Sequence, residues 1–277
     1  MRIAAAQITT GPDPDANLQL IREYTSRAAQ AGARVVVFPE AAQRAFGHPL
    51  PPVAEPVTGA WAEAVRGLAR EFQIVIVAGM FTPGVPSADG RPRVVNTLIA
   101  VGPAGPSGAA AEIDVAYDKI HLYDAFGFKE SDGVQPGRSP AQFVLDDITF
   151  GLATCYDIRF PNLFTAHARS GAQVTLVPAS WGAGEGKLAQ WRLLAQARAL
   201  DSTQYILACG QADPAAAGVD PVPGAPTGIG HSMIVSPLGV PLREAGGAPE
   251  LLIAELDPEL VSRTRELVPV LRNARQL

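Results

Sequence analysis

The run Val35-Val36-Val37-Phe38, which leads into Pro39 and Glu40, decides the fold class. Three consecutive β-branched residues followed by an aromatic residue are typical of a strand that is covered on both faces. Before this run, residues 18–29 carry apolar side chains at helical spacing, and after it residues 61–72 form a second helical segment. This alternation of buried strands with helices predicts a layered α/β domain.

The same alternation continues to the end of the chain. No change of composition and no internal repeat divides the sequence, so we predict one domain over residues 1–277. We expect further helices over residues 161–170 and 187–201, and a terminal helix that begins near Pro258. The other expected strands span residues 3–8, 74–78, 95–101, 113–117, 143–145, 149–154, 174–177, 205–209, 232–235, 241–242 and 251–255.

Composition excludes several classes of protein. Hydrophobic residues make up 47% of the 277 residues, which is too many for a disordered chain. The net charge of −5 offers no basic field for nucleic acid or anionic lipid. Two Cys are too few for a disulfide framework, and two Cys with four His are a poor set of zinc ligands. No motif implies a metal or an organic cofactor, so we expect neither. The N-terminus lacks a signal-peptide pattern and the apolar runs are strand-sized, which predicts a soluble, cytoplasmic protein.

Three polar residues come at the ends of apolar strands, where α/β proteins build their sites. Glu40 follows the opening run, Lys119 follows residues 113–117, and Cys155 follows residues 148–154. A cysteine becomes a nucleophile when a base removes its proton or a cation stabilises its thiolate, and Glu40 and Lys119 could supply these two functions. Each residue alone is common in loops and cores, and their spacing does not settle the case.

The motifs around these residues resemble the three signatures of the nitrilase superfamily, the carbon–nitrogen hydrolases. They are Val36-Val37-Phe38-Pro39-Glu40, Tyr117-Asp118-Lys119-Ile120-His121-Leu122 and Cys155-Tyr156-Asp157-Ile158-Arg159-Phe160-Pro161. Further similarity lies at residues 178–181, 191–201, 230–239 and 269–272, so the resemblance covers nearly the whole chain. The amidase-like branch is the most similar, and its fold is a four-layer α-β-β-α sandwich.

The resemblance implies a covalent mechanism. Glu40 takes the position of the general base, and Cys155 that of the nucleophile that forms a thioester. Lys119 would stabilise the oxyanion together with the backbone N–H of Tyr156. Glu130 matches a second glutamate of many members and would orient Lys119 or a substrate N–H, although a surface position is the alternative.

We expect four residues to bind the substrate: Tyr156, Arg159, Trp181 and Phe126. For Phe126, ordinary loop packing is an equally good interpretation. We expect Asp157 to shape the turn after Cys155, and none of the histidines to act as a base. His121 is expected to pack near the site, and His48 and His167 to lie at the surface.

The predicted reaction is hydrolysis of a small linear carboxamide with release of ammonia. An N-carbamoyl-amine hydrolase is the alternative, because it would use the same residues. A nitrilase is disfavoured because Tyr156 and Asp157 stand where nitrilases tend to carry Trp and Glu, and the intact Glu40, Lys119 and Cys155 disfavour an inactive binding subunit. The resemblance also implies a homodimer with residues 258–277 at its interface. Loops 41–58, 123–138 and 212–228 are expected to decide which acyl group fits.

Overall fold

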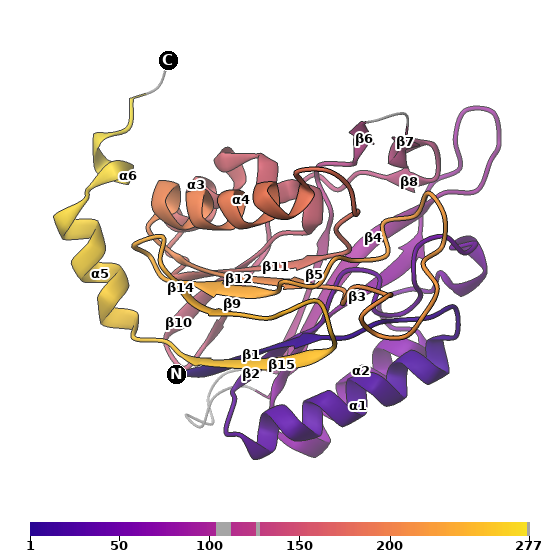
Figure 1. Ribbon diagram of the computed structural model, residues 1–277, viewed down its shortest axis with the longest axis horizontal. Coiled ribbons are helices and arrows are strands. Elements are labelled where there is room, and N and C mark those ends of the chain that lie inside the picture. The colour runs from indigo at the N-terminus through magenta and orange to yellow at the C-terminus, as the bar shows by residue number, and fades with distance from the viewer. Residues whose placement is uncertain (104–111, 126–127, 276–277) are drawn as a thin grey trace.

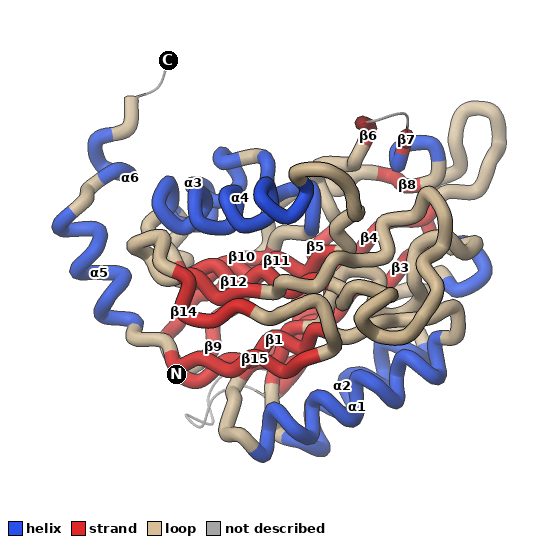
Figure 2. Tube along the Cα trace, viewed as in Figure 1, coloured by secondary structure: helices blue, strands red, loops and turns tan. Residues whose placement is uncertain are grey.

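Two stacked sheets form the centre of the molecule, and a pair of helices covers the outer face of each (Figure 1). The computed structural model describes residues 1–103, 112–125 and 128–275. Figure 2 shows both sheets, in red, enclosed between the blue helices. This arrangement is the four-layer α-β-β-α sandwich that the sequence predicts.

The first sheet has the strand order β15-β1-β2-β3-β4-β5, and β8 pairs with β4. Its strands β1, β2 and β3 are parallel neighbours, and β15 and β3-β4-β5 add antiparallel pairs. The bounds are β1 (Arg2–Gln7), β2 (Val35–Val37), β3 (Val75–Pro83), β4 (Val94–Gly102), β5 (Ile113–Asp118), β8 (Val134–Gln135) and β15 (Glu250–Glu255).

The second sheet has the order β14-β13-β12-β11-β10-β9, with β10, β11 and β12 parallel. A two-stranded sheet joins β6 (Asp124–Ala125) to β7 (Phe128–Lys129). The bounds of the second sheet are β9 (Gln142–Leu145), β10 (Ile148–Leu152), β11 (Val174–Ala179), β12 (Tyr205–Gly210), β13 (Met233–Val235) and β14 (Pro241–Glu244).

Helices α1 and α2 pack on the first sheet and α3 and α4 on the second (Figure 1). Asp13 caps α1 by accepting a hydrogen bond from the backbone N–H of Asp15, and Gly32 follows the helix with a φ of +76°. The helical bounds are α1 (Pro14–Gln30), α2 (Ala60–Phe72), α3 (Pro161–Arg169), α4 (Lys187–Ser202), α5 (Pro258–Leu267) and α6 (Val270–Asn273), with 3₁₀ turns η1 (Pro51–Val53), η2 (Glu130–Asp132) and η3 (Cys155–Arg159).

Strand β2 shows how the sequence forms two cores. Val35 and Val37 belong to the core between the sheets, whereas Val36 belongs to the core under α1 and α2. Successive side chains of a strand point to opposite faces, so only a run without polar residues can fill both layers. The continuous apolar run predicts a strand that is covered on both faces, and in the structure β2 is covered on both faces.

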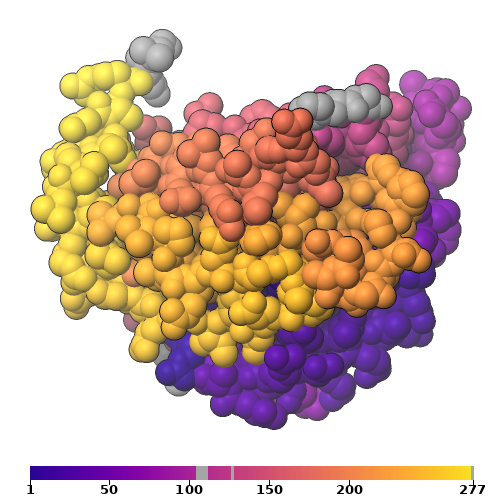
Figure 3. Space-filling view, viewed as in Figure 1, coloured from indigo at the N-terminus to yellow at the C-terminus, as the bar shows by residue number. Residues whose placement is uncertain are grey.

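The C-terminal segment lies at one edge of the sandwich. Helix α5 buries Val261 and Thr264, and Arg265 donates a hydrogen bond of 2.6 Å to the carbonyl of Ala172. In Figure 3 this segment forms a yellow ridge that projects beyond the body of the molecule. None of the helices in the described part of the chain has the length and hydropathy needed to cross a bilayer.

Candidate active site

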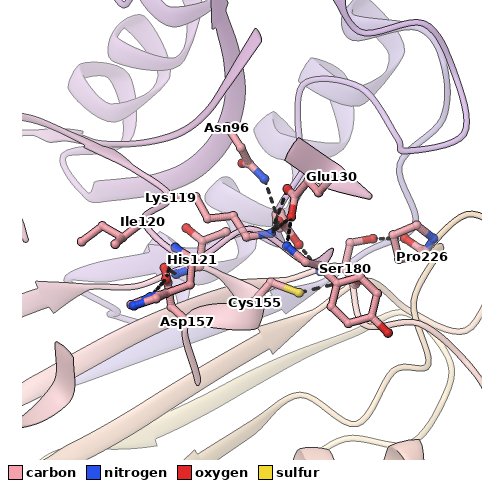
Figure 4. A network of polar contacts seen from close by, with 12 residues as sticks. Asn96, Lys119, Ile120, His121, Glu130, Cys155, Asp157, Ser180 and Pro226 are labelled. Carbon is pink, nitrogen blue, oxygen red and sulfur yellow. Dashed lines mark hydrogen bonds and ion pairs between the residues drawn. The ribbon is translucent and has the colours of Figure 1, made fainter. Parts of the chain in front are cut away.

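Strand ends from both sheets bring Glu40, Lys119 and Cys155 together. Figure 4 shows Lys119 and Cys155 with polar residues that surround them. Glu40 follows β2, Lys119 directly follows β5, and Cys155 opens η3 after β10. The exposed fractions of the three residues are 1%, 2% and 9%. The structure thus brings together the three residues that the sequence singles out, with little of their surface exposed to solvent.

The carboxylate of Glu40 accepts hydrogen bonds from Lys119, Asn96 and Ser180. Its Oε1 is 3.0 Å from Nζ of Lys119 and 2.7 Å from Nδ2 of Asn96. Its Oε2 accepts from the backbone N–H of Ser180 at 2.9 Å. Charged hydrogen bonds of this length are strong in a buried site, so the carboxylate is held in one orientation.

Glu130 places a second carboxylate on Lys119. Its two oxygens lie 3.0 and 2.9 Å from Nζ of Lys119, and Oε2 also accepts a hydrogen bond of 2.6 Å from the backbone N–H of Tyr123. Burial lowers the pKa of the ammonium, but the charges of Glu40 and Glu130 outweigh burial and hold this pKa well above its usual value of 10.5. Lys119 is therefore a permanent cation at neutral pH.

Cys155 lies in a strained turn beside this cation. Its φ of +46° is in the left-handed region, which a residue with a Cβ seldom adopts. Its Sγ lies 3.9 Å from the carbonyl oxygen of Ser180. Burial and the charge of Glu40 raise the pKa of the thiol well above 9.0, and Lys119 opposes them only in part. The resting residue is thus a neutral thiol.

Asp157 connects the Cys155 turn to the segment that carries Lys119. The fully buried carboxylate accepts from the backbone N–H of Thr154 at 2.8 Å and from the hydroxyl of Tyr117 at 2.7 Å. It also accepts from the backbone N–H of His121 at 3.0 Å, and the His121 ring stacks on Phe160. Asp157 shapes the turn, as the sequence predicts, and in addition ties together the ends of two strands from different sheets.

A cavity of about 610 Å³ opens above the thiol. Three of the four predicted substrate-binding residues line it, namely Tyr156, Arg159 and Trp181. Phe126 lies outside the described residues, while Ala125 and Phe128 contribute to the wall. The other lining residues are Glu40, Phe46, Lys119, Tyr123, Glu130, Cys155, Ser180, Gly182, Ala183, Gly184, Glu185, Lys187, Pro221, Val222, Pro223, Gly224, Ala225, Pro226 and Thr227.

One wall of this cavity is aromatic and carries two cations. The guanidinium of Arg159 lies 5.2 Å from the ring centroid of Trp181 and 5.9 Å from that of Tyr156, and it donates to Oε1 of Gln190 at 2.6 Å. The ammonium of Lys187 donates to the hydroxyl of Tyr123 at 3.2 Å. The rings of this wall therefore each lie against a cation.

The comparisons with known proteins agree with this geometry. The family model described as carbon-nitrogen hydrolase matches residues 2–266. The chain belongs to the carbon–nitrogen hydrolase family. This hydrolase is 55% identical over 275 residues to Hydrolase Rv0480c of Mycobacterium tuberculosis, which covers 99% of this chain and 95% of that protein. It is 33% identical over 276 residues to a deaminated glutathione amidase of Escherichia coli O157:H7, with 99% and 97% covered.

The fold is also similar to those of solved structures. Nit3 of Saccharomyces cerevisiae, a member of branch 10 of the nitrilase superfamily, has a TM-score of 0.79 and 28% identity and covers 98% of this chain and 94% of its own. A mutant amidase of Nesterenkonia sp. AN1, in which acrylamide has added to the active-site cysteine, has a TM-score of 0.75 and 27% identity, with 97% and 98% covered. Membership of the nitrilase superfamily is confirmed, and so is the prediction that this hydrolase is an enzyme.

Several features of the hydrolase site do not follow from the motifs. Asn96 in β4 and the backbone of Ser180 both bind Glu40. The Oγ of Ser180 donates to the carbonyl of Pro226, which fixes a loop of the cavity wall. The polar pair Asn96 and Thr97 within the mostly apolar strand β4 is a signal that the sequence contains, whereas a backbone N–H carries no sequence signal.

One histidine is misplaced by the sequence interpretation. His167 is only 1% exposed rather than at the surface, and its ring contacts the carbonyl of Leu152 at 2.9 Å and the amide of Gln142 at 3.1 Å. A side chain on Gly151 would come within 2.6 Å of this ring, so the glycine makes room for it. Within the described ranges, no three His, Cys, Asp or Glu side chains are placed to hold a metal ion.

Proposed function

We propose that this hydrolase is a thiol amidohydrolase, which cleaves a small linear carboxamide through a cysteine thioester and releases ammonia. The observation that carries the proposal is the placement of Lys119 between Glu40 and Glu130, beside the buried thiol of Cys155 at the base of a cavity. A base, a cation and a nucleophile are the three groups that acyl transfer requires. The family membership and the amidase names among the relatives support it.

In the acylation half, Glu40 takes the proton of the Cys155 thiol as Sγ attacks the carbonyl carbon. Burial raises the pKa of this thiol, which favours proton transfer during the attack over a thiolate formed beforehand. The oxyanion is stabilised by Lys119 and by the backbone N–H of Tyr156. The C–N bond then breaks, the nitrogen takes the proton from Glu40 and leaves as ammonia, and the acyl group remains on sulfur as a thioester.

In the hydrolytic half, a water molecule enters the position that ammonia leaves. Glu40 removes one of its protons as the oxygen attacks the thioester carbon, and Lys119 again faces the oxyanion. The C–S bond breaks and Sγ of Cys155 takes the proton back from Glu40. The products are a carboxylic acid and the original thiol, so every proton is accounted for.

The cavity limits the substrate to a small molecule. Its volume of about 610 Å³ is that of an ordinary small-ligand site. A linear acyl chain can extend from Cys155 along the wall formed by Tyr156 and Trp181. The deaminated glutathione amidase relative supports an amide whose acyl chain also carries polar groups. An N-carbamoyl amine remains the second candidate, because Glu40, Lys119 and Cys155 could perform the same steps on it.

Product analysis tests the proposal. Purified protein is incubated with a panel of linear amides, N-carbamoyl amines and nitriles, and ammonia and carbon dioxide are measured. We expect ammonia without carbon dioxide from an amide, whereas both gases would favour the carbamoyl reaction. The Cys155→Ser variant should lose at least about 10³-fold in rate. Undiminished turnover by that variant on every accepted substrate would refute the covalent mechanism.

We further propose a homodimer that uses residues 258–277, and a cytoplasmic location. Leu267 is 78% and Val268 48% exposed on the projecting segment, which a second copy could cover. Leu260, in contrast, packs against its own core. A reducing cytoplasm would keep Cys155 as a free thiol. Light scattering that reports a monomer would refute the dimer.

A further inference from the structure

Asn96 makes two separate contacts with the residues that flank the thiol. Its side-chain Nδ2 donates to Oε1 of Glu40 at 2.7 Å, and its backbone carbonyl accepts from the backbone N–H of Lys119 at 2.9 Å. The side chain is fully buried in β4, and Figure 4 draws its hydrogen bond among the polar contacts around Lys119. A substitution at Asn96 therefore alters the contact with Glu40 and leaves the backbone contact with Lys119 in place.

The stability of the fold does not explain this residue. Its Oδ1 is buried and has no hydrogen-bond partner within the described part of the chain. A buried carbonyl oxygen without a partner costs stability, and an apolar residue of similar size would avoid that cost. The contact with Glu40 is thus what distinguishes asparagine from leucine at this position.

The two carboxylate oxygens of Glu40 accept hydrogen bonds from different donors. A carboxylate oxygen has about two acceptor positions, and both positions on Oε1 are used, by Asn96 and Lys119. The Oε2 atom has one donor, the backbone N–H of Ser180. The thiol of Cys155 is also a hydrogen-bond partner of the Glu40 carboxylate. Because Asn96 and Lys119 occupy Oε1, Oε2 is the oxygen with an acceptor position left for this thiol.

We propose that Asn96 is a positioning residue that occupies Oε1 and so directs the proton of Cys155 to Oε2 of Glu40. The proposal rests on the proposed function, in which Glu40 is the base. The proton passes from Sγ to Oε2, and from Oε2 to the departing nitrogen, while Oε1 keeps its two donors throughout. Without Asn96 the carboxylate can rotate and pair more fully with Lys119, which turns the free acceptor position away from sulfur.

Two variants test this role. Asn96→Leu removes the donor at similar volume, and Asn96→Asp replaces the donor with an acceptor of the same shape. We expect Asn96→Leu to lose about 10- to 100-fold in kcat, as expected for one hydrogen bond to a charged group, with KM within about twofold and an unchanged or higher Tm. Asn17→Leu is the matched control, because Asn17 is 1% exposed and its amide bonds only backbone groups of Gly11 and Gln43.

The pH profile of Asn96→Asp provides a readout that a purely structural role would not change. Once protonated, the introduced acid can again donate to Oε1, so the ratio of variant to wild-type kcat should rise as the pH falls. The same ratio for Asn96→Leu should stay flat. A wild-type kcat in folded Asn96→Leu, a loss confined to KM, or a flat ratio for Asn96→Asp would overturn the proposal. If the wild type hydrolyses no amide while iodoacetamide still modifies Cys155, the proposed function fails instead.

Discussion

Both carboxylate oxygens of Glu130 lie within 3.0 Å of the Nζ of Lys119. Nζ also contacts Glu40, so acceptors surround an ammonium group that has three N–H donors. An oxyanion that approaches Lys119 must therefore share or replace one of these contacts. The position and charge of Glu130 consequently bear directly on how well Lys119 can stabilise a reaction intermediate.

The Glu130→Gln variant should lose about 10- to 100-fold in kcat, because one charged contact that holds Lys119 is weakened at nearly constant shape. Steady-state kinetics on the best amide substrate and a Tm measurement test this expectation. Asp132→Asn is the control, since Asp132 lies in the same η2 turn but is exposed, and it should retain wild-type rates. A wild-type kcat for Glu130→Gln would mean that Glu40 alone positions the ammonium.

The Glu40→Gln variant should separate chemistry from thiol reactivity. Turnover should fall by about 10²- to 10⁴-fold, because the variant lacks the carboxylate that we propose as the general base. The rate at which iodoacetamide modifies Cys155 should hold or increase, because the charge of Glu40 is one cause of the raised pKa of this thiol. Kinetic assays and mass spectrometry of Cys155 measure the two rates. A parallel loss of both would show that Glu40 acts by positioning the sulfur.

Stability should fall at alkaline pH. The folded-state pKa values of Cys155 and Lys119 are raised above 9.0 and 10.5, so the folded chain keeps protons that the unfolded chain releases. Their contribution is fully present below about pH 9 and is lost as the pH rises, by up to about 1.4 kcal/mol per pH unit for each group. Urea unfolding under reducing conditions from pH 7 to 10.5 measures it, and Cys155→Ser should show a shallower decline. Equal slopes for the two proteins would contradict this assignment.

The sequence predicts the layers and the three central residues for different physical reasons. The strand at Val35–Val37 is predictable because a strand buried on two faces must be apolar at every position. The roles of Glu40 and Cys155 come from motif resemblance, since neither residue alone distinguishes a site from a core or a loop. Asn96 could be noticed as a polar residue in a mostly apolar strand, but its partner Glu40 is 56 positions away, and only the assembled first sheet reveals the contact.

Other contacts cannot be predicted from the sequence. Ser180 binds Glu40 through its backbone N–H, which nearly every residue possesses, so only tertiary structure selects this one. His167 is predicted at the surface because histidine is polar and lies on a short helix, and it is buried because Gly151 lacks a Cβ there. Both cases depend on the close approach of segments that are distant in the chain, which local periodicity does not encode.

The origin of the reacting groups in two different sheets couples catalysis to folding. Glu40 and Lys119 follow strands of the first sheet, whereas Cys155 and Ser180 follow strands of the second. Neither sheet alone contains a complete set, so a partly unfolded chain with one intact sheet has no base opposite its thiol. Under the proposed mechanism, activity therefore reports the docking of the two halves, and Cys155 acquires its general base only when the sandwich closes.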